Sequence, residues 1–252
     1  MKQMKGIYEL EIGNTKVFVI ESKKNILVDT GSGPVPKELL SFMEETGLKF
    51  KNEEVKKEMM DGAYSRITEF LEQEKLKVDA IICTHCHNDH TGNLKRLKEF
   101  LKVPVAMHPY DIPFAEGTEE LPIPPGFPQE LRKYLKTEPC KVDIQLQDEE
   151  FFTDDVQVIH IKGHTRGNIC LVVRDQALIA GDCVTGRNEA NPMFGPNELN
   201  PPVEMFCMDY AQALKSLKKL LHYNFTAIFP SHGSSITEEG KKKLEKMIQG
   251  IV

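Results

Sequence analysis

The stretch from Cys83 to Asn93, which reads Cys-Thr-His-Cys-His-Asn-Asp-His-Thr-Gly-Asn, constrains this chain more than any other part of it. It directly follows Ala80-Ile81-Ile82, an apolar run that predicts a strand. His85 and His87 are two residues apart, so in extended backbone their side chains point the same way. We therefore expect a polar loop that begins at the end of a buried strand and gathers several imidazoles.

Three histidines and one aspartate fall within six residues of this stretch: His85, His87, Asp89 and His90. Neutral imidazoles and a carboxylate that converge on one point suit a zinc-like divalent ion, with iron or manganese as alternatives. Residues so close in sequence do not surround an ion by themselves, so further ligands must come from other strand ends. Three turns of small residues, each after an expected strand, offer them: His164 after Gly163, Asp182 after Gly181, and His232 between Ser231 and Gly233.

Short apolar runs separated by turn residues predict two successive sets of strands and helices. The expected strands are 7–12, 17–21, 26–29, 78–83 and 103–108, then 142–146, 156–161, 169–173, 177–180 and 225–229. The expected helices lie within an insertion at about 36–75, near 93–102 and 208–222, and from residue 237 onward. This order predicts an α/β fold of two sheets packed face to face with helices outside, in one domain over residues 1–252.

Two proline-rich segments interrupt this order and are typical of lids or binding loops. Residues 109–139 contain seven prolines, with one helix expected near 129–136, and residues 186–202 contain four. Four apolar residues of the first segment could line a pocket or pack the loop down, and the sequence leaves both interpretations open: Phe114, Leu121, Ile123 and Phe127.

The balance of 32 basic against 38 acidic residues, a net charge of −6, argues against nucleic acid as the obligatory partner.

The six cysteines do not form a disulfide framework in a chain of 252 residues, and we interpret Cys83 and Cys86 as an incidental Cys-x-x-Cys pair. We expect free thiols, no signal peptide, no membrane span and a cytoplasmic protein. The expected partner is a small-molecule substrate, and the helical insertion could form a homodimer interface.

The ordered motifs resemble those of the metallo-β-lactamase superfamily, whose dinuclear zinc hydrolases carry H-x-H-x-D-H, here His85-Cys86-His87-Asn88-Asp89-His90. The other motifs also stand in the order of the family. Asp29 lies in a strand-end turn before the H-x-H-x-D-H motif, and the turns that hold His164, Asp182 and His232 come after it. The resemblance implies a four-layer αββα sandwich with two metal ions at one edge between the sheets. It implies the following ligands: His85, His87 and His164 for the first ion, Asp89, His90 and His232 for the second, and Asp182 as the bridge.

The resemblance also implies a mechanism. Two cations about 3.5–4 Å apart lower the pKa of a bridging water, so that hydroxide is available at neutral pH. Asp89 would orient this hydroxide. Asp29 would accept the N–H of a ligand histidine and so fix its tautomer, although it could instead cap its own turn. Thr84, Thr165 and Ser231 are weaker candidates for the same supporting role.

Three kinds of reaction fit such a site. The favoured one is hydrolysis of a small carboxylic ester, thioester or lactone, as in the glyoxalase II-like and lactonase-like branches. Lactonases of acyl-homoserine lactones use a tyrosine just beyond the position of Asp182, and this chain has none there. Antibiotic-degrading enzymes typically carry a metal-binding cysteine at the position that Asp182 occupies here. The alternatives are a phosphodiesterase or nuclease with the same dinuclear site, and a persulfide dioxygenase with one iron on His85, His164 and Asp182.

Overall fold

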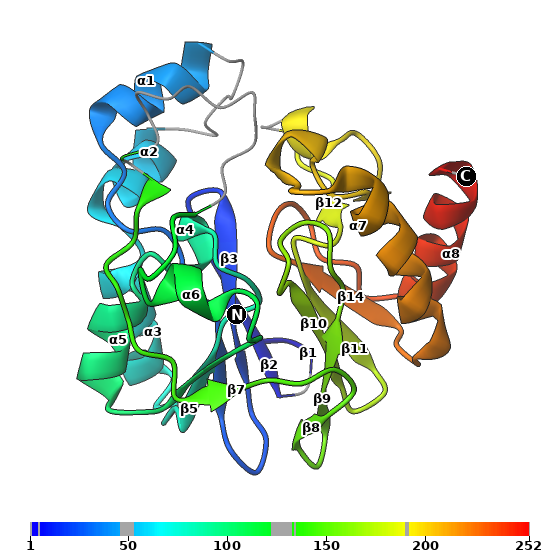
Figure 1. The fold of residues 1–252 in the computed structure, drawn as a ribbon, viewed down its shortest axis with the longest axis horizontal. Helices are drawn as coiled ribbons and strands as arrows, with labels where there is room; N and C mark the ends of the chain where they lie inside the picture. Colours follow the sequence, from blue (N-terminus) through cyan, green and yellow to red (C-terminus); the bar gives the residue numbers. More distant parts are fainter. Residues whose placement is uncertain are drawn as a thin grey trace.

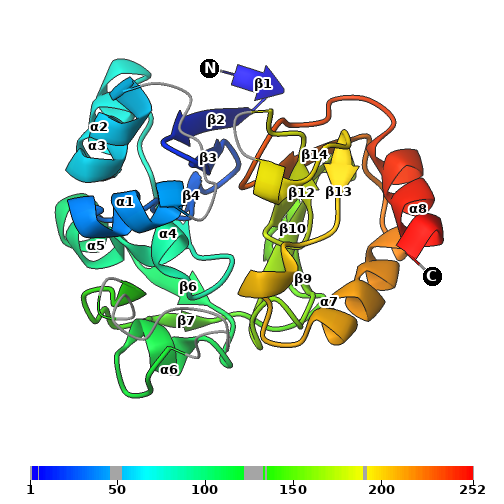
Figure 2. The same cartoon turned by 90° about the horizontal axis from the view of Figure 1, so that it is seen from above.

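Two β-sheets face each other, and helices cover the outer face of each (Figure 1). This computed structural model describes residues 2–4, 6–45, 53–121, 133, 135–189 and 192–251. From above, the layers follow one another as helices, sheet, sheet and helices (Figure 2). The fold is therefore the αββα sandwich that the sequence predicts.

The first sheet has seven strands in chain order, antiparallel from β1 to β4 and parallel from β4 to β7. Its strands are β1 (Lys2–Met4), β2 (Ile7–Ile12), β3 (Thr15–Ile20), β4 (Ile26–Val28), β5 (Ala80–Ile82), β6 (Val105–Met107) and β7 (Ile144–Gln145). Because β4, β5 and β6 are parallel, the residues after them meet at one edge. Asp29, the loop that begins at Cys83, and the turn that begins at His108 therefore lie together.

The second sheet has five strands in the order β14-β11-β10-β9-β8. They are β8 (Phe151–Thr153), β9 (Val156–His160), β10 (Ile169–Val173), β11 (Ala177–Gly181) and β14 (Ala227–Pro230). β11 and β14 are parallel neighbours, so Asp182 and His232 follow strands that end at the same edge. This arrangement brings the two later turns beside each other, although about 50 residues separate them in the chain.

The helices form the two outer layers. Beside the first sheet lie α1 (Lys37–Glu45), α2 (Glu53–Asp61), α3 (Tyr64–Gln73) and α5 (Leu94–Leu101), and beside the second lie α7 (Tyr210–Leu217), η4 (Lys218–His222) and α8 (Gly240–Ile251). The remaining elements of the described residues are short: α4 (Asn88–Thr91), α6 (Ile112–Ala115), η2 (Pro192–Phe194), η3 (Glu204–Phe206), and the antiparallel pair of β12 (Thr185–Gly186) and β13 (Leu199–Asn200). In the described residues no helix is both long and apolar enough to cross a membrane.

Strand β3 shows how the core is divided. All six of its residues are buried. Val17 and Val19 pack toward the helices, whereas Phe18 and Ile20 pack between the sheets, because side chains alternate along a strand. Phe18 meets Phe229 of the second sheet edge to face, with ring centroids 6.1 Å apart. Burying such apolar faces on both sides of each sheet is the main force that holds the four layers together.

Most expected elements are present, with shifted ends. The expected helix at 208–222 begins after Asp209, whose side chain accepts a hydrogen bond from Gln212 N, and tightens into the 3-10 turn η4. Residues 46–52, 122–132, 134, 190 and 191 are outside the described residues. Most of the helix expected near 129–136, together with Ile123 and Phe127, lies in these segments. Phe114 and Leu121 are half-buried.

Candidate metal centre

The loop after β5 consists of a bend, which contains His85, and the single helical turn α4, which contains His90. His87 has extended backbone (φ −64°, ψ 151°) and precedes α4, so Asp89 and His90 lie on the first helical turn. Gly92 ends this turn against residues 32 and 33, where a Cβ would come within 2.1 Å of Gly33 N. A glycine is therefore required at position 92 for the loop to close against the Asp29 turn.

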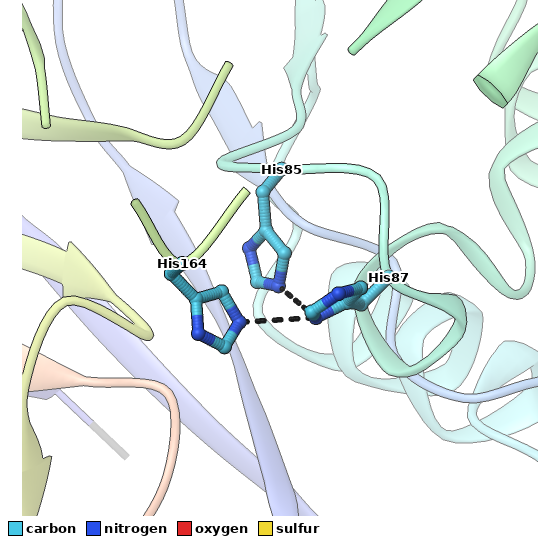
Figure 3. Close-up of side chains that lie close together, drawn as sticks. All are labelled: His85, His87 and His164. Carbon is cyan, nitrogen blue, oxygen red and sulfur yellow. Dashed lines mark hydrogen bonds between the residues drawn. The ribbon is translucent and has the colours of Figure 1, made fainter. Parts of the chain in front are cut away.

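Three imidazoles converge at one end of the centre (Figure 3). His85 Nε2 lies 3.1 Å from His87 Nδ1, and His164 Nε2 lies 3.0 Å from the same atom. Burial lowers the pKa of His85 well below its ordinary value and that of His164 to about 3, and the neighbouring imidazoles add to both shifts. These side chains are therefore neutral at pH 7, which is the form that binds a metal ion.

A second group consists of Asp89, His90 and His232. The Oδ2 atom of Asp89 lies 3.2 Å from His232 Nε2 and 3.6 Å from His90 Nε2. Burial opposes the charged form of His232, but Asp182 and Asp89 together raise its pKa to about 10. Without a metal ion the carboxylates thus hold a proton on this histidine, and a divalent cation would take the place of that proton.

Asp182 lies between the two groups. Its Oδ2 is 3.4 Å from both His164 Nε2 and His232 Nε2, and its Oδ1 is 3.4 Å from His90 Nε2. Asp182 Oδ1 and His90 Nε2 are buried and have no hydrogen-bond partner among the described residues. Buried polar atoms are rarely left unsatisfied. Inward-facing polar atoms without partners fit a bound cation. The His and Asp ligand atoms form three overlapping sets, and within each set the atoms lie within 4.8 Å of one another.

The outward nitrogen of each of four histidines has its own contact. His90 Nδ1 donates to Asp29 Oδ2 at 2.8 Å, and His232 Nδ1 donates to the backbone oxygen of Asn14 at 2.6 Å. The other two contacts are His85 Nδ1 with Thr84 Oγ1 at 3.1 Å and His164 Nδ1 with Cys207 Sγ at 3.6 Å. Such contacts fix which nitrogen faces the metal. Asn14 and Cys207 were not expected from the sequence.

Asp29 makes the contact that the sequence predicts. It is fully buried, and it also accepts hydrogen bonds from Thr84 N (2.7 Å) and Thr84 Oγ1 (2.8 Å). Its φ of 63° lies in the left-handed region, where Asp and Asn are tolerated better than most residues. The carboxylate thus joins two distant segments of the centre, which goes beyond capping its own turn.

Two of the weaker candidates, Thr165 and Ser231, make no hydrogen bond to a candidate ligand histidine in the described part of the chain. The hydroxyl of Thr165 donates to Asp111 at 2.6 Å. Ser231 Oγ is buried and has no hydrogen-bond partner in the described part of the chain. For these two residues the sequence-based expectation was wrong, because a position beside a ligand does not determine where a short hydroxyl points. Thr84, by contrast, contacts both Asp29 and His85.

The expected second lid reaches the centre. Phe194 of η2 stacks on His232, with ring centroids 4.5 Å apart and planes 8° from parallel. Its backbone oxygen accepts a hydrogen bond from Thr185 Oγ1 at 2.6 Å, so the aromatic ring is held from the hairpin side. The sequence indicates no role for Phe194, because only the folded chain brings it to residue 232. All six cysteines are free, as expected, and all six are buried.

Comparison with known proteins agrees with this geometry. The family model of the metallo-beta-lactamase superfamily matches residues 10–232. The chain belongs to this superfamily. It is thus a member of a superfamily of metallo-hydrolases that bind divalent metals, and its cluster of His and Asp residues could bind such ions.

Three similar proteins illustrate the range of the superfamily. A beta-lactamase-like protein 2 homolog of Drosophila melanogaster is 26% identical over 233 residues, which are 91% of this chain and 62% of that protein. A hydroxyacylglutathione hydrolase of Shewanella baltica (strain OS185) is 29% identical over 121 residues, 48% of this chain and 39% of that protein. A metallo-beta-lactamase family protein of Thermus thermophilus has a crystal structure with a TM-score of 0.65 and 17% identity, covering 98% of this chain and 80% of its own. This chain thus spans less than two thirds of the fly protein and of the Shewanella protein.

Proposed function

We propose that this protein is a metal-dependent hydrolase that cleaves a small carboxylic thioester, ester or lactone with two divalent ions, zinc foremost and iron or manganese as alternatives. The observation that carries the proposal is the position of Asp182, whose two carboxylate oxygens face both groups of ligand atoms. One carboxylate between two such groups suits a pair of ions better than a single ion.

The contacts support a ligand assignment for this proposal. His85, His87 and His164 would hold one ion, Asp89, His90 and His232 would hold the other, and Asp182 would contact both. When bound, divalent ions of this kind lower the pKa of a coordinated water and polarise a carbonyl oxygen. The buried atoms without hydrogen-bond partners, His90 Nε2 and Asp182 Oδ1, support this assignment.

Asp89 is suited to orient the attacking water. Burial opposes its charge, but His90 and His232 hold its pKa below its usual range, so it is a carboxylate at neutral pH. Its side chain is also the most accessible of the acidic ligands, 31% exposed against 10% for Asp182. A carboxylate that reaches the solvent side can accept a hydrogen bond from a water and align it for attack.

Two features favour a carboxylic substrate over a phosphodiester. In the described part of the chain, Asp89 and Asp182 form ion pairs with histidines only, and no lysine or arginine pairs with either carboxylate. Phosphate groups are usually held by Arg or Lys. Phe194 offers an apolar surface against His232, and the similarity to the Shewanella hydroxyacylglutathione hydrolase supports a thioester within this class.

The test is a substrate panel with metal-loaded protein: an acyl-glutathione thioester, aryl esters, lactones, a phosphodiester, and a persulfide with oxygen consumption as the readout. We expect hydrolysis of at least one carboxylic substrate. The variant Asp182→Asn should lower it about 10³-fold, because a metal centre supplies several kcal/mol of transition-state stabilisation. His222→Ala, at the end of η4, is the matched control and should retain activity. Turnover of the phosphodiester alone, or of the persulfide alone, would contradict the proposal in favour of that reaction.

A further inference from the structure

Another buried carboxylate, Asp111, lies where the two sheets meet beside the centre. It follows β6, and none of its side chain is exposed. It precedes the short helix α6 at the N-cap position, where an aspartate usually accepts a hydrogen bond from the first turn. Here the side chain makes no such bond. The carboxylate has been turned away from its own helix, so helix capping does not explain it.

The oxygens of Asp111 accept three hydrogen bonds from the two loops that carry the histidines. Oδ2 accepts from Cys86 N at 3.0 Å and from Thr165 Oγ1 at 2.6 Å, and Oδ1 accepts from Gly167 N at 2.7 Å. Cys86 stands between His85 and His87, and Thr165 directly follows His164. One carboxylate therefore fixes the first loop, which belongs to the first sheet, against the second loop, which belongs to the second sheet.

Close packing leaves this carboxylate little freedom to move. A Cβ added to Gly167 would come within 2.8 Å of Asp111 Cγ, Oδ1 and N. Ile169 N, at the start of β10, also donates to Thr84 O at 2.9 Å, so a direct backbone hydrogen bond joins the same two parts of the chain. Burying a carboxylate is unfavourable unless hydrogen bonds compensate it. A buried carboxylate with three donors from ligand loops is the arrangement expected of a residue that preorganises a site.

We propose that Asp111 is a positioning residue, which sets the distance between His164 and the pair His85 and His87 and so makes the three-histidine group competent to bind a metal ion. The inference rests on the proposed function, because it assumes that these histidines are ligands. It concerns a residue that touches neither the ion nor the substrate. The residue acts through Cys86, Thr165 and Gly167.

Asp111→Asn is the sharpest variant, because it keeps the shape of the side chain but places an amide N–H₂ against backbone or hydroxyl donors. Thr165→Val removes one donor and leaves the other two. Gly167→Ala keeps the carboxylate but crowds it. Asp143→Asn is the matched control, since Asp143 accepts from Val105 N at 2.9 Å and pairs with Lys98, outside the metal-ligand loops.

The measurement is the Zn²⁺ dissociation constant of each variant by competition with a chromogenic chelator, beside its melting temperature without metal. Loss of a residue that supports a ligand typically weakens metal binding about 10–100-fold. We expect that loss for at least one Zn²⁺ equivalent in Asp111→Asn, a smaller loss in Thr165→Val and Gly167→Ala, and none in Asp143→Asn.

Wild-type Zn²⁺ affinity in Asp111→Asn would overturn the positioning role, as would an equal loss in Asp143→Asn, which would indicate general loosening of the sheet. If Asp111→Asn does not fold, Thr165→Val decides. Weaker Zn²⁺ binding at an unchanged melting temperature supports the role, and unchanged binding overturns it. A wild-type protein that takes up no Zn²⁺ would instead contradict the proposed function, so the two failures are distinguishable.

Discussion

The imidazole of His232 donates its Nδ1–H to the backbone oxygen of Asn14 at 2.6 Å, across 218 positions of sequence. The acceptor lies in the turn between β2 and β3, so this hairpin near the start of the chain orients its last histidine. Because the acceptor is a backbone atom, no side-chain substitution at residue 14 removes it. The shape of the turn is what holds the acceptor in place.

The turn can be altered at Gly13, which has φ 61° and whose Cβ would come within 2.7 Å of Met59 Cγ. Gly13→Ala should lower the free energy of unfolding by about 1 kcal/mol, because alanine is strained at positive φ. It should also weaken metal binding through the displaced Asn14 oxygen. Urea unfolding and a Zn²⁺ titration measure the two effects. Gly250→Ala in α8 is the control: a Cβ there meets nothing within 4 Å, so neither quantity should fall.

Asp29 can be tested with two variants that separate its charge from its backbone. Asp29→Asn keeps a residue that tolerates φ 63° but places an amide against the donors of Thr84 and His90. It should lower the free energy of unfolding by about 1–3 kcal/mol and weaken metal binding about 10–100-fold. Asp29→Ala loses the acceptor and strains the backbone, so it should be less stable still. Metal binding by Asp29→Asn at the wild-type level would show that the hydrogen bond to His90 is not needed.

Phe194 tests the nature of the substrate. Phe194→Leu keeps an apolar side chain against His232, and Phe194→Ala removes most of it. If an apolar acyl group packs here, Phe194→Ala should raise KM for the cleaved ester or thioester about 10-fold, with a smaller change in kcat, because a few methylene groups contribute roughly 1–3 kcal/mol to recognition. Phe194→Leu should lie between the two. A lower melting temperature with an unchanged KM would assign Phe194 to packing alone.

We expect His108 to contribute to the pH dependence of the free energy of unfolding. Burial lowers its pKa to about 4, and the stacked ring of His160, at 3.9 Å between centroids, shifts it in the same direction. Between pH 6.5 and 4 the unfolded chain binds a proton at this histidine that the folded protein does not. Stability should therefore fall as the pH drops through that window, by up to about 1.4 kcal/mol per pH unit from this group.

The variant His108→Phe retains a ring to stack on His160 and removes the titration. Urea unfolding at pH 7 and pH 5 should show a smaller loss of stability in this variant than in the wild type. An equal loss in both proteins would mean that other groups, and not His108, govern the response to acid in this range.

The cluster of candidate metal ligands was predictable because its signal is local. His85, His87, Asp89 and His90 share one short motif, and His164, Asp182 and His232 each follow a strand-like run closely. Parallel pairing of β4 with β5 and of β11 with β14 then brings these strand ends together. The alternation of Phe18 and Ile20 with Val17 and Val19 likewise marks a strand buried on both faces.

Apart from Asp29 and Thr84, the residues that contact the candidate ligands or their loops were not predictable, because long-range contacts create their roles. Asp111 is an ordinary N-cap residue by its neighbours, and only the folded chain presents to it the donors of residues 86, 165 and 167. Asn14 contributes a backbone oxygen, which no residue type identifies. Short elements such as α4 and β12 span too few residues for a period of 3.6 or 2 to be recognised.

The most direct test of the whole account is the metal content of the protein purified without added metal, measured by inductively coupled plasma mass spectrometry with Asp182→Asn in parallel. We predict about two equivalents of zinc, manganese or iron per wild-type chain. Asp182→Asn, which loses a ligand atom facing both groups, should hold fewer. One iron per chain would contradict the paired centre. No metal, with none taken up on titration, would contradict the assignment of this cluster as a metal site.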